Sequence, residues 1–143
     1  RSLEFNRVSY IDMAIEAGRS FNLIHLQSSY KFDIFPLTSD PYHQSQFGRR
    51  QFEHATPFGT EPIEFAVATA EDVILSKLHW YRMEGEISEQ QWNDVLGVIS
   101  IQRDRLDLAY LRQWAQYLKV NDLLDQALSE RHEPCEWSSF RYF

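Results

Sequence analysis

The stretch ATAEDVILSKLHWYR, residues 68–82, decides how the chain folds. Thr69 and Asp72 have the spacing of a capping box, in which a threonine oxygen and an acidic residue three positions later close the first turn of a helix. The apolar residues that follow have helical spacing, and Gly85 is a typical helix end. The pattern predicts a helix from the capping box to about Met83.

Three more helices are expected downstream, which together with the first predict a C-terminal bundle of about four. Ser88 and Gln91 form a second capping box at the start of one of them. The next is expected over about 107–118, and the last begins with Asn121 as its cap. The side chains expected to be buried are Trp92, Val95, Leu96 and Ile99, then Leu108, Leu111, Ala115 and Leu118, then Leu123, Leu124, Ala127 and Leu128.

The residues before this bundle favour short elements of β-structure. Stretches 21–26 and 30–37 are rich in strand-forming residues and flank a polar turn, which predicts a hairpin. A helix is expected before it at about 9–17, ending at Gly18. A turn-rich loop is expected after it at 39–47, because Pro41 disfavours the helical conformation of Asp40.

A second hairpin is expected with arms at 50–55 and 63–67, joined by a tract of turn-forming residues. Ile63, Phe65 and Val67 alternate with polar or small residues, which indicates that one face of this strand is buried.

Strands therefore come first and helices second, an order typical of the α+β class. The predicted fold is a small mixed or antiparallel sheet followed by the helical bundle. The expected division is a strand-rich part at 1–68, a helical part at 69–131 and an aromatic tail at 132–143.

Composition limits the classes of function. The 143 residues include 43% hydrophobic residues, enough for a buried core, and a single cysteine, Cys135, which excludes an internal disulfide. The low cysteine content indicates the reducing cytoplasm as the location. No apolar run is long enough to span a bilayer, so no membrane contact is expected. A net charge of −7 argues against binding nucleic acid by general attraction.

Two charged residues stand out against apolar surroundings. Asp33 lies in the middle of an apolar strand, where a rigid carboxylate suits a magnesium site, although it could equally face water beside Lys31. Lys77 could project into a cleft and neutralise a triphosphate, or run its stem over Trp80 to solvent. Asp94 on the next helix is placed to pair with Lys77, either as a positioning device or as a salt bridge of small value.

Arg49 and Arg50 form the tightest basic pair of the first half of the sequence. Each guanidinium can contact phosphate in bidentate geometry, whereas a solvated loop is the default for such a pair. The five histidines lack close spacing of the kind that zinc sites use.

The segments FNLIH, KFDIF, the Arg-Arg pair, ATAEDVILSKLHWYR, SEQQWNDVLGVI and LDLAYLRQWA, taken in this order, resemble a known family. They are similar to the later portion of bacterial nucleotidyltransferase-like proteins of the DNA polymerase beta superfamily, close to the abortive-infection toxin branch. The resemblance covers about residues 21–128. It implies Mg²⁺-dependent nucleotidyl transfer from a nucleoside triphosphate, with Asp33 as metal ligand, Lys77 beside the nucleotide and Asp94 as a downstream motif residue.

The sequence departs from that family in its first part. No Gly-Gly or Gly-Ser helix start and no Asp-x-Asp strand precede Asp33, and two bridging metal ions need more than one protein carboxylate. The chain alone is therefore expected to bind Mg-nucleotide weakly and to transfer nothing. Truncation, a missing half on another chain, or loss of catalysis would each explain this departure.

Three functions follow as hypotheses. The chain is an incomplete nucleotidyltransferase-like domain, a non-catalytic protein-binding or regulatory module of the toxin–antitoxin kind, or a plain structural domain. The partners to be expected are a nucleoside triphosphate in the first case and a protein or a second copy of the chain in the second.

Overall fold

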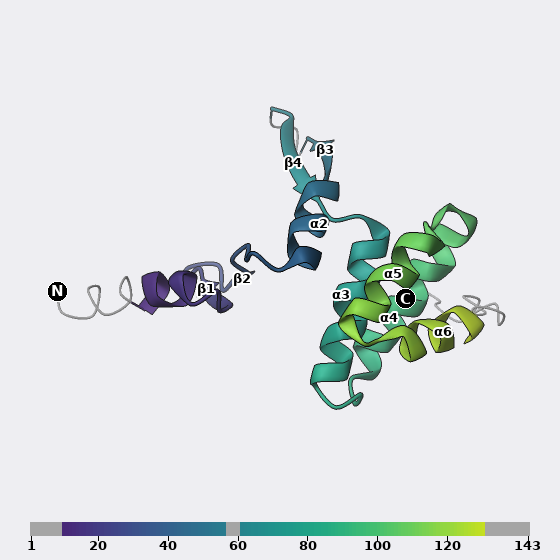
Figure 1. Ribbon diagram of the computed structural model, residues 1–143. Helices are drawn as coiled ribbons and strands as arrows, with labels where there is room; N and C mark the ends of the chain where they lie inside the picture. The colour runs from purple at the N-terminus through teal and green to yellow at the C-terminus, as the bar shows by residue number, and fades with distance from the viewer. Residues whose placement is uncertain (1–9, 57–60, 131–143) are drawn as a thin grey trace, which may run out of the picture. The chain divides into compact units, whose positions relative to one another are not determined.

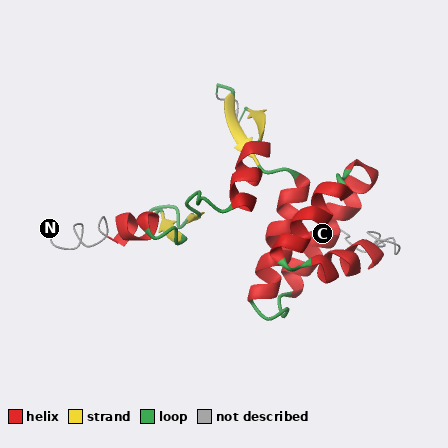
Figure 2. Cartoon of the chain, viewed as in Figure 1, coloured by secondary structure: helices red, strands yellow, loops and turns green. Residues whose placement is uncertain are grey.

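The computed structural model describes residues 10–56 and 61–130 and shows a mixed α+β protein (Figures 1 and 2). It contains two separate two-stranded antiparallel sheets in place of the single sheet expected. The chain divides into two compact units, of which the first ends at Gly48 and the second begins at Arg49. The first unit contains one hairpin, and the second contains the other hairpin and the helical bundle.

The described part of the first unit starts with helix at 10–16, which ends as predicted at Gly18 in the left-handed conformation (φ +61°). Strands β1 (Phe21–Ile24) and β2 (Lys31–Ile34) follow and form the predicted hairpin, with Leu23 opposite Phe32. Both strands are shorter than expected. The unit is lightly packed, since most side chains of the hairpin are exposed.

Helix α2 (Pro41–Arg49) contradicts the predicted loop at 39–47. The Asp40 carboxylate accepts hydrogen bonds from the backbone N–H groups of Tyr42 and His43, at 2.9 and 3.1 Å. Asp40 is therefore an N-cap, and Pro41 occupies the first helical position, where its missing N–H costs nothing. The error was to treat Pro41 as a helix breaker, when in this position it favours a helix start.

Strands β3 (Gln51–Ala55) and β4 (Ile63–Val67) pair as the predicted second hairpin. The predicted burial of one face is wrong, because Ile63 is 51% exposed and Phe65 is 41% exposed. Alternation correctly predicted which side chains share a face. It could not predict that a two-stranded sheet would leave that face largely uncovered.

The second unit continues with four helices, as predicted: α3 (Ala70–Met83), α4 (Glu89–Gln102), α5 (Leu108–Leu118) and α6 (Asn121–Glu130). The Thr69, Ser88 and Asp107 side chains each accept a hydrogen bond from the backbone N–H three residues later, which caps α3, α4 and α5. Gly85, with φ +80°, ends the first of these helices. Local capping chemistry therefore sets the bundle boundaries to within a residue or two of their expected positions.

The bundle holds the core of the second unit. Helix α3 packs on α4 and α5, and α6 packs on α4 and α5 (Figure 1). One residue expected in the core, Leu108 in the first turn of α5, is instead 43% exposed. The apolar side chains with 0 or 1% exposure are Ile74, Leu75, Leu78, Val95, Ile99, Leu111, Ala115, Val120, Leu124 and Ala127.

Two sequence predictions lie outside the described residues. They concern the aromatic tail at 132–143 and part of the turn between the arms of the second hairpin.

Candidate functional site

The start of α3 carries a buried carboxylate whose two oxygens both accept hydrogen bonds from neighbouring side chains. The Asp72 side chain has 0% exposure. Its Oδ2 accepts a hydrogen bond from the Thr69 hydroxyl at 2.8 Å, and its Oδ1 accepts one from the Tyr110 hydroxyl on α5 at 2.7 Å. Burying a carboxylate is costly unless such donors compensate it, so this acid fixes α3 against α5.

Arg49 closes the same cluster from the side of the hairpin. Its Nη2 donates to Glu71 Oε2 at 3.2 Å, and its Nε lies 3.7 Å from Asp72 Oδ2. The guanidinium carbon lies 3.8 Å from the centroid of the Tyr110 ring, a cation–π geometry. The predicted phosphate-binding arginine is therefore already paired with two carboxylates and an aromatic ring.

The groups around Glu71 lower the pKa of its carboxyl. Burial raises the pKa of Glu71, but hydrogen bonds outweigh that effect, and the pKa falls below its ordinary value of 4.5. The principal donor is the backbone N–H of Asp107, 2.9 Å from Glu71 Oε1, and the positive charge of Arg49 adds to the effect. Glu71 is therefore an anion at neutral pH and a structural bridge between α3 and the start of α5.

Lys77 and Asp94 meet as predicted. Lys77 Nζ lies 2.7 Å from Asp94 Oδ2, so the ion pair joins α3 to α4. The two side chains are 34% and 45% exposed, which places the pair at the rim of the bundle, where it contributes little to stability.

A small hollow adjoins this pair, and we call it the Lys77 hollow. It has a volume of about 170 Å³ and is lined by Ser76, Lys77, Trp80 and Gln91. Among the described residues, Gln91 Oε1 is buried and accepts no hydrogen bond, although its Nε2 donates to Glu84. Trp80 is 41% exposed. The hollow thus combines a cation with an aromatic ring, which are groups that bind small polar ligands.

The other predicted site residues do not line this hollow. Asp33 is in the first unit, on β2, and Lys77 is in the second, so neither unit by itself contains both. Asp33 pairs with Lys31 at 3.1 Å and is 48% exposed, which matches the alternative that it faces water beside Lys31. Arg50 lies over the Phe52 ring at 5.4 Å.

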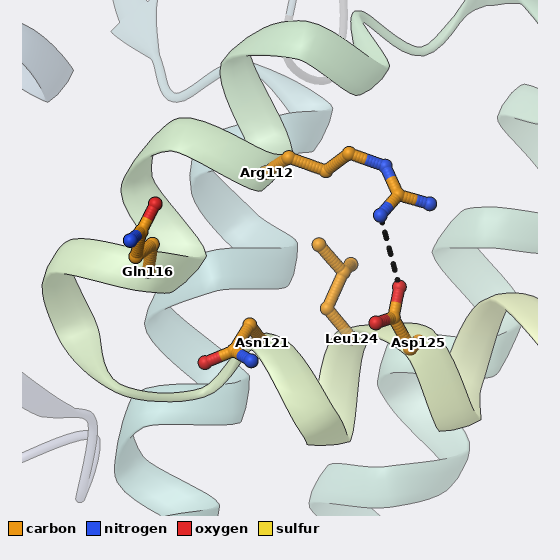
Figure 3. A pocket seen from close by; sticks show the side chains of 5 residues that line it. All are labelled: Arg112, Gln116, Asn121, Leu124 and Asp125. Atoms are coloured by element: carbon orange, nitrogen blue, oxygen red, sulfur yellow. Dashed lines mark ion pairs between the residues drawn. The ribbon is translucent and has the colours of Figure 1, made fainter.

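A larger cavity, of about 330 Å³, lies between α5 and α6 and was not predicted (Figure 3). Arg112 and Asp125 pair across it at 3.3 Å, and Gln116, Asn121 and Leu124 complete its lining. Arg112 and Asp125 are 63% and 56% exposed, so this cation is solvated and neutralised where it stands. The lining has no aromatic ring to hold a ligand, and we give this cavity less weight than the Lys77 hollow.

Within residues 10–56 and 61–130, no three histidine, cysteine, aspartate or glutamate side chains gather as metal ligands would. In the same part of the chain, no helix has both the length and the apolar character needed to cross a membrane. Comparison with protein-family models, with curated proteins and with solved structures finds no match.

Sequence reasoning found the Lys77–Asp94 pair but missed the Arg49–Glu71–Asp72–Tyr110 cluster. Lys77 and Asp94 are 17 positions apart on consecutive helices, whereas the cluster joins Asp72 to Tyr110, 38 positions apart, and also brings Arg49 onto the Tyr110 ring. One signal was available, because Asp72 precedes Leu75 by three positions and so shares its apolar helix face.

Proposed function

We propose that the chain carries the later part of a nucleotidyltransferase-like domain of the DNA polymerase beta superfamily, near the abortive-infection toxin branch. Its parent chemistry is Mg²⁺-dependent transfer of a nucleotidyl group from a nucleoside triphosphate. By itself the chain binds Mg-nucleotide weakly and transfers nothing. The observation that carries the proposal is the ion pair of Lys77 and Asp94 beside the Lys77 hollow.

Support comes first from how Lys77 is held. Helix α3 is anchored by its Thr69 cap and by the Asp72 hydrogen bonds, and it packs directly on α4. A cation on so fixed a helix pair presents a charge at a defined position, and phosphoryl-transfer sites need such a charge to neutralise phosphate oxygens.

The volume of the Lys77 hollow sets what it holds. About 170 Å³ is below the roughly 300–1,000 Å³ of sites that enclose a whole ligand. It accommodates one phosphate group near Lys77, with the half-exposed Trp80 ring at its edge as a surface on which a base stacks. The rest of a nucleotide extends into solvent, which explains why weak binding is expected.

Asp94 lowers the affinity further. Its carboxylate already neutralises the Lys77 ammonium at 2.7 Å, and an incoming phosphate competes with it. In this proposal Asp33 is the protein ligand of Mg²⁺, and Arg49 and Arg50 are auxiliary phosphate contacts. A single carboxylate with 48% exposure holds Mg²⁺ loosely, and Arg49 has to leave Glu71 to reach a phosphate.

The test measures binding of Mg-ATP and Mg-CTP by calorimetry and by the shift in melting temperature that a bound ligand produces. Lys77→Ala is expected to weaken binding about tenfold, because a charge-assisted phosphate contact is lost. Asp94→Asn is expected to strengthen binding severalfold, because Lys77 loses its competing carboxylate. Asp33→Ala should weaken binding only when Mg²⁺ is present.

Arg112→Ala is the matched control, since it removes one positive charge from the other cavity of the same unit. It should bind nucleotide as the parent chain does. Absence of any nucleotide binding to the parent chain, or equal loss in Lys77→Ala and Arg112→Ala, would contradict the proposed site.

A second function, that of a non-catalytic protein-binding module, draws on a different observation. Both hairpins expose large apolar side chains, including Phe32 at 55% and Phe52 at 55%. Such side chains on short sheets are typical of surfaces that bind another protein. Nucleotide binding sensitive to Lys77 favours the first function, and its absence favours the second.

A further inference from the structure

The hairpin of the first unit has an open edge. Among the described residues, β2 pairs only with β1, and a two-stranded hairpin alone is marginally stable in water. The His25 N–H donates to the Tyr30 carbonyl at 2.8 Å, which marks that pair as hydrogen-bonded. Because hydrogen-bonded and non-bonded pairs alternate along an antiparallel ladder, Lys31 and Asp33 direct their backbone groups away from β1, toward the open edge.

The sequence at this edge is complementary to itself. Read in opposite directions, Lys31-Phe32-Asp33 places lysine opposite aspartate at both ends and phenylalanine opposite phenylalanine in the centre. The Lys31 and Asp33 side chains are 54% and 48% exposed and share one face of the strand. An antiparallel copy of the same strand therefore places an opposite charge across from Lys31 and across from Asp33.

The opposite face of the hairpin is apolar and incompletely covered. It carries Phe21, Leu23, Phe32 and Ile34, and at its centre Leu23 is 42% exposed and Phe32 is 55% exposed. Pairing two such edges would place Leu23 and Phe32 of one copy in a row with Phe32 and Leu23 of the other. Cross-strand apolar neighbours of this kind stabilise sheets, and phenylalanine pairs do so most effectively in non-hydrogen-bonded positions, where side chains are closest.

We propose that two copies of the chain associate through β2, antiparallel and centred on Phe32, to form one four-stranded sheet. The two-fold axis passes between the two Phe32 residues and makes the interface closed and self-complementary. Lys31 and Asp33 of each copy exchange backbone hydrogen bonds with Asp33 and Lys31 of the other. Strand addition at an exposed sheet edge is a common mode of protein recognition.

The charged side chains determine register more than affinity. Lys31 and Asp33 already pair within one chain at 3.1 Å, and exposed pairs of this kind are weak. Association exchanges two internal pairs, one in each copy, for two pairs between copies, so the net change in free energy from these charges is close to zero. Affinity therefore comes from the backbone hydrogen bonds and the Phe32 row, whereas wrong charges at the edge oppose association.

The experiment is a charge-exchange test by sedimentation equilibrium, over about 5 to 500 µM protein. The parent chain is expected to show a reversible monomer–dimer equilibrium. In a dimer of the Lys31→Glu variant, the new glutamate of each copy lies opposite Asp33 of the other. In a dimer of the Asp33→Lys variant, the new lysine of each copy lies opposite Lys31 of the other. Each variant alone should raise the dimer dissociation constant by about tenfold to thirtyfold, because two attractive contacts become two repulsive ones.

An equimolar mixture of the two variants restores both attractive pairs between unlike chains. It should form heterodimers at least as tight as the parent dimer, a result that a folding defect in either variant could not produce. Phe32→Ala should also weaken the dimer, and mixing this variant with either charge variant should not restore association. Glu64→Lys, a charge reversal on the other hairpin, is the control and should leave the dissociation constant unchanged.

Three results would overturn the proposal: a parent chain that is monomeric throughout the range, a dimer insensitive to Lys31 and Asp33, or variants that fail to associate on mixing. None of these measurements contains nucleotide. They therefore succeed or fail independently of the Lys77 hollow.

Discussion

The helical bundle and the two hairpins differ in how far their apolar side chains are buried. In the bundle, side chains such as Ile74, Leu75 and Leu78 have no exposed surface, and three helices begin at capped residues. In the hairpins, large apolar residues such as Phe32 and Phe52 remain more than half exposed. The bundle is thus a self-sufficient structure, whereas the hairpins carry apolar surface that their own units leave uncovered.

This difference suits the bundle and the hairpins to two different kinds of binding. The bundle can hold charged side chains at fixed positions, as it does with Lys77 and Asp94, because its core and caps determine the backbone. The hairpins offer backbone edges and apolar faces, which recognise other strands by pairing. A ligand site is expected on the first and an association surface on the second.

The largest effect is expected from truncating the core of the bundle. Leu78→Ala should lower the free energy of unfolding by about 2–5 kcal/mol, since the side chain has 0% exposure and its loss leaves a cavity between helices. Urea unfolding followed by circular dichroism measures this. Met83→Ala on the same helix, where Met83 is 73% exposed, is the control and should change stability by less than about 0.5 kcal/mol. Equal losses in both variants would mean that this face of α3 is not the core.

A smaller effect is expected at the polar link between the bundle and the residues before it. The pKa of Glu71 is lower in the folded chain than its ordinary value of 4.5, mainly through hydrogen bonds that outweigh burial. The stability that Glu71 contributes is therefore fully present above about pH 4.5 and is lost as the pH falls through its lower folded pKa. Glu71→Gln should cost about 1 kcal/mol at pH 7, and the difference from the parent should shrink toward pH 3.

Urea unfolding at pH 7, 5, 4 and 3 provides the measurement, and only the difference between parent and variant is attributed to Glu71 because other carboxylates titrate as well. Glu53→Gln removes the charge of an exposed carboxylate on β3 and is the control, because a surface substitution of this kind should change stability little. A difference between parent and Glu71→Gln that stays constant down to pH 3 would show that the charge of Glu71 is unimportant.

Most of the bundle could be predicted because its determinants are local. Thr69 and Asp72, or Ser88 and Gln91, lie within one helical turn, and the apolar stripes that follow them repeat every three or four residues. The same local rules located both hairpins. They failed at Asp40 and Pro41, where a cap followed by a proline at the first helical position was read as a loop.

The site could be predicted only in part, for a physical reason. Lys77 and Asp94 lie on consecutive helices whose packing follows from their apolar stripes, so their contact could be foreseen. Arg49, Glu71 and Tyr110 meet because α5 returns to the start of α3, and no local pattern encodes that return. Burial of the hairpin faces depends likewise on what packs against them, which alternation does not specify.

The smallest effect is expected on the exposed face of the second hairpin. Phe52→Ala should lower the free energy of unfolding of the bundle by no more than about 0.5 kcal/mol, because Phe52 is 55% exposed and its notable neighbour is Arg50, at 5.4 Å from the ring. The measurement is the same urea titration used for Leu78→Ala. A loss approaching that of Leu78→Ala would mean that Phe52 is covered in solution, and the contrast between a self-sufficient bundle and uncovered hairpins would then fail for β3 and β4. A small loss, by contrast, means that the exposed Phe52 ring does not contribute to the fold, which leaves it available to contact a binding partner.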